Sequence, residues 1–230
     1  GYFLNSIDMQ KTVDGPAWRD EDQQIYLTLF WRTLLMSVTI TASCILLGYP
    51  VAWLLANLQA RTANLLMIFV LLPFWTSLLV RTSAWKILLQ QQGVINDILV
   101  WLGIVSDGGR LALINNATGT IIAMTHILLP FMILPLYANM EKLDATLNEA
   151  AADLGSGPIN TFFKITLPLT MPGIIAGSLL VFIPATGEYV IPDLLGGGNV
   201  QMIGRLLYNE FARNIDWPVA CAVAIVLLML

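Results

Sequence analysis

The chain has 230 residues, of which 57% are hydrophobic and only 11% are charged, and its formal net charge is −4. Soluble domains carry about 25% charged residues and disordered chains carry more, so this composition excludes both classes. The negative balance also argues against a nucleic-acid partner, which would require a clustered basic surface. We therefore expect a polytopic membrane protein.

The chain opens on a polar, acidic stretch that includes Asp20-Glu21-Asp22. No signal peptide is recognisable, and the chain begins at Gly1 rather than at an initiator methionine, so we expect further residues before it. We expect residues 1–32 to form an external loop.

Apolar runs then follow one another along the chain. A membrane-spanning helix needs about 20 apolar residues, which four runs supply and a fifth does not. The four predicted spans are 33–58, 63–89, 117–140 and 169–191, and the short fifth run is 219–230. Proline lies within the spans at Pro50, Pro73, Pro130, Pro135 and Pro184. This pattern predicts an all-α bundle of kinked helices around a pathway, with the chain ending inside a helix.

Three loops between the spans carry information. Residues 93–103 form a short amphipathic stretch suited to lying along the membrane interface. The loop 141–168 is the most polar internal segment, and the loop 192–218 contains three consecutive glycines followed by a helix-like stretch at 203–213.

The polar loop 141–168 contains a spaced motif. It reads Glu149-Ala150-Ala151, three residues, Gly155, nine residues, and then Ile165-Thr166-Leu167-Pro168. Residues 143–154 are good helix formers, and Gly155 is a suitable helix terminator. The small side chains of the alanines would let a partner's backbone approach this helix closely. The motif therefore predicts a helix, a turn and a second helix between two spans.

This spacing resembles the EAA loop of ABC-importer permeases, E-A-A-x3-G-x9-I-x-L-P. Other segments resemble polyamine permeases, and most closely the putrescine-type subunit; they are residues 72–77, 81–85, 184–197, 202–205 and 214–220. The resemblance implies a type I ABC-importer transmembrane domain over residues 33–230, in a bacterial inner membrane. Such subunits have about six helices, so the first helix and part of the last would lie outside this chain.

The resemblance also implies partners. In the family the EAA loop is cytoplasmic and docks into a cleft of the ATP-binding subunit, which would bind ATP and Mg. The implied ATPase-coupling residues are Glu149, Ala150, Ala151, Gly155, Ile165, Leu167 and Pro168. A second permease subunit and a periplasmic polyamine-binding protein complete the assembly. The positive charges of this chain, counted by strict alternation of the spans, favour the opposite side as cytoplasmic.

The chain itself has no phosphate-binding G-x4-G-K-[ST] loop and no Cys/His cluster. We therefore expect no catalytic residue, metal or cofactor in this subunit, and a separate ATPase as the energy source.

Candidate pathway residues lie near the ends of two predicted spans. Carboxylates and aromatic faces suit flexible cations, so Glu188 and Tyr189, with Trp75 and Trp85, could contact a polyamine. The alternatives are a carboxylate at the membrane interface, which is cheap to place there, and tryptophans of an aromatic belt.

The sequence thus predicts the permease subunit of an ATP-driven polyamine importer for putrescine, working by alternating access. One alternative keeps the family and changes the cargo to spermidine or another small solute. A second alternative is an ion-coupled secondary transporter, which would not need an ATPase.

Overall fold

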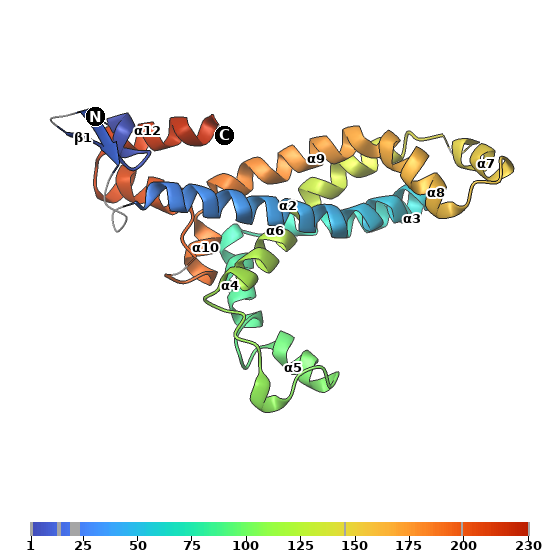
Figure 1. Ribbon diagram of the computed structural model, residues 1–230. Helices are drawn as coiled ribbons and strands as arrows, with labels where there is room; N and C mark the ends of the chain where they lie inside the picture. Colours follow the sequence, from blue (N-terminus) through green and yellow to red (C-terminus); the bar gives the residue numbers. More distant parts are fainter. Residues whose placement is uncertain (1, 13–14, 19–23, 145, 199, 230) are drawn as a thin grey trace. The chain divides into compact units, whose positions relative to one another are not determined.

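The computed structural model describes residues 2–12, 15–18, 24–144, 146–198 and 200–229, which are mostly helical (Figure 1). The first part contains α1 (Tyr2–Asn5), the antiparallel strands β1 (Met9–Thr12) and β2 (Gly15–Trp18), and the long helix α2 (Tyr26–Asn57). The middle contains α3 (Ala60–Leu71), the 3-10 turn η2 (Leu72–Trp75), α4 (Leu78–Leu88), α5 (Val94–Trp101), η3 (Asp107–Gly109) and α6 (Ala117–Met140). The last part contains α7 (Thr146–Asp153), α8 (Pro158–Thr161), the π-helical turn η4 (Phe162–Thr166), α9 (Leu167–Gly187), α10 (Val190–Leu195), α11 (Ile203–Tyr208), the π-helical turn η5 (Asn209–Arg213) and α12 (Trp217–Leu228).

The chain divides into two compact units. Unit 1 contains residues 1–39, 82–123 and 184–230, and unit 2 contains residues 40–81 and 124–183. The helices α2, α4, α6 and α9 each contribute residues to both units.

Three helical stretches in the described part of the chain are long and apolar enough to cross a membrane. They are α2, α6 and the stretch Pro158–Gly187, which runs without a break through α8, η4 and α9. The third predicted span, 117–140, matches the bounds of α6, and the all-α membrane bundle is confirmed.

The first predicted span begins too late. α2 starts at Tyr26, so the helix contains the last residues of the predicted loop 1–32, and α1 and the β1–β2 hairpin lie in the described part of that segment. The carboxylate of Asp8 accepts hydrogen bonds from the backbone N–H groups of Tyr26, at 3.2 Å, and Leu27, at 2.7 Å, which satisfies donors in the first turn of α2. The side of the membrane on which this segment lies stays a prediction.

The second predicted span, expected as a kinked helix, consists of two helical stretches with a sharp bend between them. The stretches Ala60–Trp75 and Leu78–Leu88 qualify as a span only together, and they are bent by 97°. Pro73 has no N–H for the helix ladder, and Thr76 takes an extended conformation in which its Oγ1 donates to the Pro73 carbonyl at 2.8 Å. The side chain thus satisfies the backbone where the helix stops.

The fourth predicted span is wrong at its end. α9 stops at Gly187 rather than continuing to Ile191, and a separate helix, α10, begins at Val190. Glu188 therefore lies between two helices and not inside a span.

Unit 2 is built on close packing of α2, α6 and α9. A Cβ at Gly177 of α9 would lie 2.6 Å from Sδ of Met132, and one at Gly48 of α2 would lie 3.1 Å from Cγ of the same residue. Between α2 and α6, the Cys44 thiol donates to the Thr125 carbonyl at 3.5 Å. Small residues at these positions let the backbones approach, as is usual between membrane helices.

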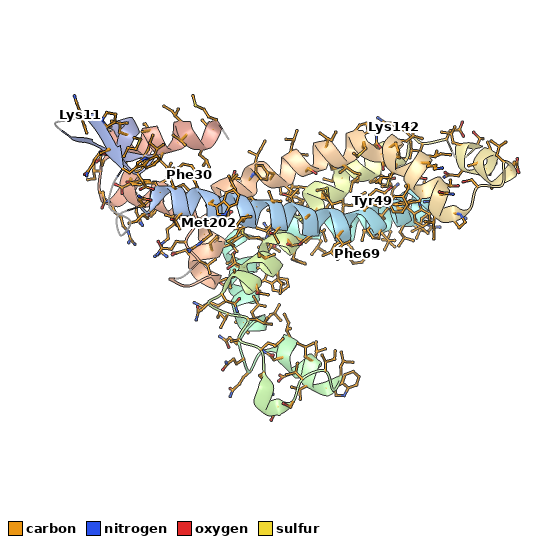
Figure 2. All side chains as sticks on the ribbon, in the orientation of Figure 1. Lys11, Phe30, Tyr49, Phe69, Lys142 and Met202 are labelled. Atoms are coloured by element: carbon orange, nitrogen blue, oxygen red, sulfur yellow. The ribbon has the colours of Figure 1, made fainter. Side chains whose placement is uncertain are left out.

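Unit 1 has its own apolar core where α2 begins. Leu29 and Phe30 pack with Ile203, Val219 and Val223, and all five are buried. The Ile203 N–H donates to Thr33 Oγ1 at 2.9 Å, which joins the start of α11 to α2. Figure 2 labels Phe30 on α2 and, just before α11, the fully buried Met202.

Candidate functional site

The polar loop 141–168 begins with a capped helix. The carboxylate of Asp144 accepts from the Thr146 backbone N–H at 3.0 Å, and the Asp144 carbonyl accepts from the Leu147 N–H at 3.2 Å. This backbone donor lowers the pKa of Asp144, because it favours the ionised carboxylate. The cap satisfies N–H groups at the start of α7 and fixes where that helix begins.

The other end of α7 is closed by Gly155. Its backbone has a φ of +78°, the left-handed conformation that glycine adopts without steric cost. The Gly155 N–H donates to the Ala152 carbonyl and the Ser156 N–H to the Ala151 carbonyl, both at 2.9 Å. This pair of bonds is the Schellman arrangement, and it turns the chain sharply after α7.

The next helix starts after a second glycine. Gly157 is in an extended conformation, and Pro158 occupies the first helical position of α8, where a missing N–H costs nothing. Thr161 Oγ1 lies 3.1 Å from Ser156 Oγ and 3.2 Å from the Gly157 carbonyl, so it ties α8 back to the turn. From there the helical path continues through η4 and α9 to Gly187.

The two halves of the EAA motif meet in space. α7 and α8 pack against each other, and Thr166 Oγ1 lies 3.3 Å from Asn148 Oδ1, a bond between the start of the long helix and α7. Ala151 is buried in this contact region. The two halves of the motif are therefore joined by helix packing as well as by the chain between them.

The loop is also braced against α2. Tyr49, labelled in Figure 2, lies on α2; its ring meets that of Phe162 edge to face at 5.6 Å, and its hydroxyl lies 3.1 Å from Thr170 Oγ1. A mostly apolar hollow of about 820 Å³ lies here, with Trp53 of α2 and Ala152 of α7 among its lining residues. The brace holds the first turn of α9 and the π-helical turn, while the hollow leaves space beside α7.

Several large apolar side chains of the loop are exposed. Leu154 is 87% exposed, and Ile159 and Phe163 are also exposed. Glu149, Ala150 and Asp153 of α7 are exposed as well, so α7 presents small and acidic groups close to an apolar rim.

The predicted coupling residues occupy different positions in this arrangement. Glu149, Ala150, Gly155 and Pro168 are exposed, Ile165 and Leu167 are half-buried, and Ala151 is buried. The exposed members could touch a partner, whereas Ala151 packs inside the loop. Their role in coupling stays a prediction.

Glu188 acts as a helix cap in the structure. Its Oε1 accepts from the Val190 N–H at 2.8 Å and lies 3.4 Å from the Ile191 nitrogen. The adjacent Tyr189 stacks on Tyr208 with ring centroids 4.9 Å apart and planes 11° from parallel. An ion pair of 2.7 Å between Arg205 and Asp193 joins α10 to α11 in the same loop.

The two tryptophans of the predicted pathway lie on opposite sides of the 97° bend. Trp75, at the end of η2, is almost fully exposed and belongs to unit 2, whereas Trp85 on α4 is half-buried and belongs to unit 1 with Glu188 and Tyr189. The structure thus gathers Tyr189 with Tyr208 and does not define one cluster of the four predicted residues.

Sequence reasoning missed several residues that shape these loops. Asp144 could have been found, because an aspartate two residues before an alanine-rich helix is a usual capping signal. The Asn148–Thr166 and Arg205–Asp193 pairs had no such signal, since each joins residues more than a helical turn apart in the sequence.

The comparisons with known proteins agree with the membrane fold. The family described as "Binding-protein-dependent transport system inner membrane component" matches residues 29–230. The spermidine/putrescine transport system permease protein PotB of Haemophilus influenzae is 44% identical over 206 residues, which are 90% of this chain and 71% of that protein. The PotB protein of Escherichia coli K12 is 43% identical over 203 residues, 88% of this chain and 73% of its own length.

A solved structure shows the same fold at low sequence identity. It is the crystal structure of a bacterial alginate ABC transporter in complex with an alginate pentasaccharide-bound periplasmic protein. The TM-score is 0.64 at 18% identity, and the match covers 89% of this chain and 75% of the other.

Proposed function

Because this chain belongs to the inner membrane components of binding-protein-dependent transport systems, we propose that it is the permease subunit of an ATP-driven polyamine importer. The observation that supports the cargo class is its 44% identity, over 90% of its length, to a permease named for spermidine and putrescine transport. In this proposal a periplasmic polyamine-binding protein delivers the substrate, and a second permease subunit completes the pathway. Separate ATP-binding subunits hold ATP and Mg.

The loop 141–168 is the proposed contact with the ATPase. α7 is capped by Asp144 and closed by Gly155, so it would move as one rigid piece. It is tied to the stretch Pro158–Gly187 by the Asn148–Thr166 bond as well as by the intervening turn. When the ATPase subunits close and displace α7, the displacement would therefore be transmitted to the membrane helix, because no flexible linker lies between them. This movement would drive alternating access.

Putrescine is the cargo we propose to test first, with spermidine as the competitor. The assembled transporter is placed in proteoliposomes with its binding protein outside and ATP inside, and uptake of each labelled polyamine is measured. We expect uptake that requires both ATP and the binding protein. Uptake without ATP would contradict the proposed energy source. Uptake of spermidine but not of putrescine would identify spermidine as the cargo instead.

Glu188 and Tyr189 belong to the proposed pathway, together with Trp75 and Trp85. Since Glu188 also caps α10, its charge and its hydrogen bonds must be separated. Glu188→Gln keeps an acceptor oxygen and removes the charge, whereas Glu188→Ala removes both. A lower apparent affinity for putrescine in Glu188→Gln would support substrate contact. Wild-type uptake in Glu188→Gln with a defect only in Glu188→Ala would leave Glu188 as a structural cap.

A further inference from the structure

The loop between α4 and α6 is a folded module, which we call the α5 module (residues 89–116). The buried side chain of Asn96 holds it together: Nδ2 donates to the carbonyls of Gln90 at 3.1 Å and Leu111 at 3.0 Å, and Oδ1 accepts from the Leu111 N–H at 2.9 Å. Both donor hydrogens and the acceptor of this amide are used. One side chain thus joins the two ends of the loop.

Arg110 makes a second set of ties on the polar side. Its Nη1 donates to Asp97 Oδ1 at 2.8 Å and to the Gln91 carbonyl at 3.0 Å, and its Nε donates to Asp107 Oδ1 at 2.9 Å. These two carboxylates raise the pKa of Arg110, which keeps the guanidinium charged. The charges of the module are therefore paired with one another.

The opposite side of α5 is apolar and exposed. Val94, Ile98, Trp101 and Leu102 follow the spacing of one helix face, and all four are exposed, Trp101 by 83%. Ile104, just beyond the helix, is exposed too. α5 thus buries its asparagine and leaves Ile95, Leu99 and Val100 half-buried, while one face of larger apolar side chains stays exposed, which is unusual for a helix on a soluble protein.

The module cannot lie far from the membrane surface. α6 begins at Ala117 and contains 24 residues, so it is about 36 Å long and its first residue lies close to the edge of a hydrocarbon core about 30 Å thick. Leu111, which Asn96 binds, is six residues before Ala117 and so can lie at most about 20 Å from it. At the other end, α4 stops at Leu88 and α5 begins at Val94 (Figure 1).

We propose that the exposed face of the α5 module lies in the lipid–water interface of the bilayer, on the side where α6 begins. Tryptophan and aliphatic residues suit that region, and the paired charges of Asp97, Asp107 and Arg110 remain on the polar side of the module. Asp97, three residues after Val94 and four before Trp101, borders this face, but its charge is paired with Arg110. The bilayer is within reach through α6. The module anchors the first turn of α6 at a fixed depth. This proposal rests on the membrane spans and does not depend on the cargo.

Spin labels test this placement. The variants are Ile98→Cys on the apolar face and Gln92→Cys on the polar side, each in a Cys221→Ser background, since Cys221 is exposed and Cys44 is buried. The assembled transporter is placed in lipid nanodiscs without binding protein. The accessibility of each label to molecular oxygen, which concentrates in lipid, is compared with its accessibility to a water-soluble nickel chelate. We expect the ratio to favour oxygen at position 98 and the nickel chelate at position 92.

Three results at position 98 would overturn the proposal. Free access of the nickel chelate would mean that the face lies in water. Protection from both reagents would mean that another protein subunit covers it. In a second measurement the binding protein is added, and nickel access that is lost only then would make the face a docking site for that protein. Circular dichroism and assembly of each labelled variant verify that the fold is retained.

Discussion

The two loops on either side of α6 achieve a fixed shape by different means. The loop 90–116 depends on polar side chains that reach far along the chain, since Asn96 binds Leu111 and Arg110 binds Asp97. The loop 141–168 depends mainly on short-range backbone geometry, with Asp144 capping α7 and Gly155 closing it. In the loop 141–168, backbone hydrogen bonds close the turn, so most side chains of α7 remain available to a partner. In the loop 90–116, the polar side chains hydrogen-bond within the loop, and an apolar face of α5 remains exposed.

The largest effect is expected from Asn96→Leu, which breaks the first loop. The substitution leaves the Leu111 N–H without its acceptor, at about 1–3 kcal/mol if that group stays buried and unpaired, whereas the Gln90 and Leu111 carbonyls keep bonds from the Gly93 and Leu113 N–H groups. Hydrogen exchange of the amides in residues 90–116 should accelerate by about 10- to 100-fold, as a loss of about 1–3 kcal/mol implies, with little change in residues 146–166. Gln92→Ala, at an exposed position of the same loop, is the control. Unchanged exchange in Asn96→Leu would show that the clamp does not hold the loop.

Gly155→Leu comes second and breaks the other loop. The left-handed backbone costs a leucine about 1–2 kcal/mol, while no atom lies within 4 Å of its Cβ position, so the subunit should still fold. We expect polyamine-stimulated ATPase activity to fall strongly, because the turn after α7 would change direction.

Gly157→Leu is the matched control for that variant. It adds the same side chain two residues away, also into open space, at an ordinary φ of −70°. It should retain stimulated ATPase activity, and Gly155→Asn should recover part of it, since asparagine tolerates the left-handed conformation. Wild-type stimulation in Gly155→Leu would count heavily against the coupling role. An equal defect in Gly157→Leu would point to side-chain bulk rather than to the backbone.

Arg110→Gln tests the second set of contacts in the loop 90–116, and its effect on hydrogen exchange should be smaller. It removes the ion pairs with Asp97 and Asp107, which are exposed to solvent, while the Asn96 clamp remains. Exchange should increase only around residues 107–110, and the difference from wild type should shrink at high salt because salt screens exposed pairs. Opening of the whole loop would mean that Arg110, and not Asn96, is the main tie.

The smallest effect is expected from acidification of the Asp144 cap. Its pKa is lowered in the folded loop, so its stabilising contribution is present above its ordinary pKa of about 3.9 and is lost as the pH falls through the lower folded value. The amide proton of Thr146, followed by NMR in nanodiscs, should titrate with a midpoint below that ordinary value. Asp144→Asn should abolish this titration. A midpoint at or above the ordinary value would contradict the cap.

The sequence predicts the parts of the fold that depend on composition and on single residues. α6 has the predicted bounds because polar residues flank a long apolar run. α7 ends at Asp153, just before Gly155, because few residues other than glycine adopt the left-handed turn there. The break after Pro73 was not predictable from proline alone, since Pro50, Pro130 and Pro135 lie inside unbroken helices. At this break the Thr76 hydroxyl and its N–H both donate to the Pro73 carbonyl, a local detail that the proline pattern does not predict.

The candidate site was predicted where it is a local motif and missed where it depends on distant contacts. The spacing of the EAA motif predicted a helix, a turn and a second helix, which are α7, the turn at Gly155 and the helical stretch that begins at Pro158; the coupling role of these residues stays a prediction. The cap made by Glu188 was missed because the apolar run continues through Val190 and Ile191, so nothing in composition marks the end of α9. The Asn96 clamp required knowledge of which backbone groups come within reach of that amide.

The π-helical turn η4 lies within the nine-residue spacing of the motif and the residues that follow it, and it affects which face of α9 points toward the neighbouring helix. An α-helix advances by about 100° per residue, and a π turn accommodates one residue more than an α turn. The stretch Phe162–Thr166 therefore stores one surplus residue between the loop and the face of α9 on which Gly173 and Gly177 meet α6. Deleting one residue there would convert the wide turn into an ordinary one and leave both faces in place. The same deletion inside α9 would rotate everything beyond it away from its neighbours.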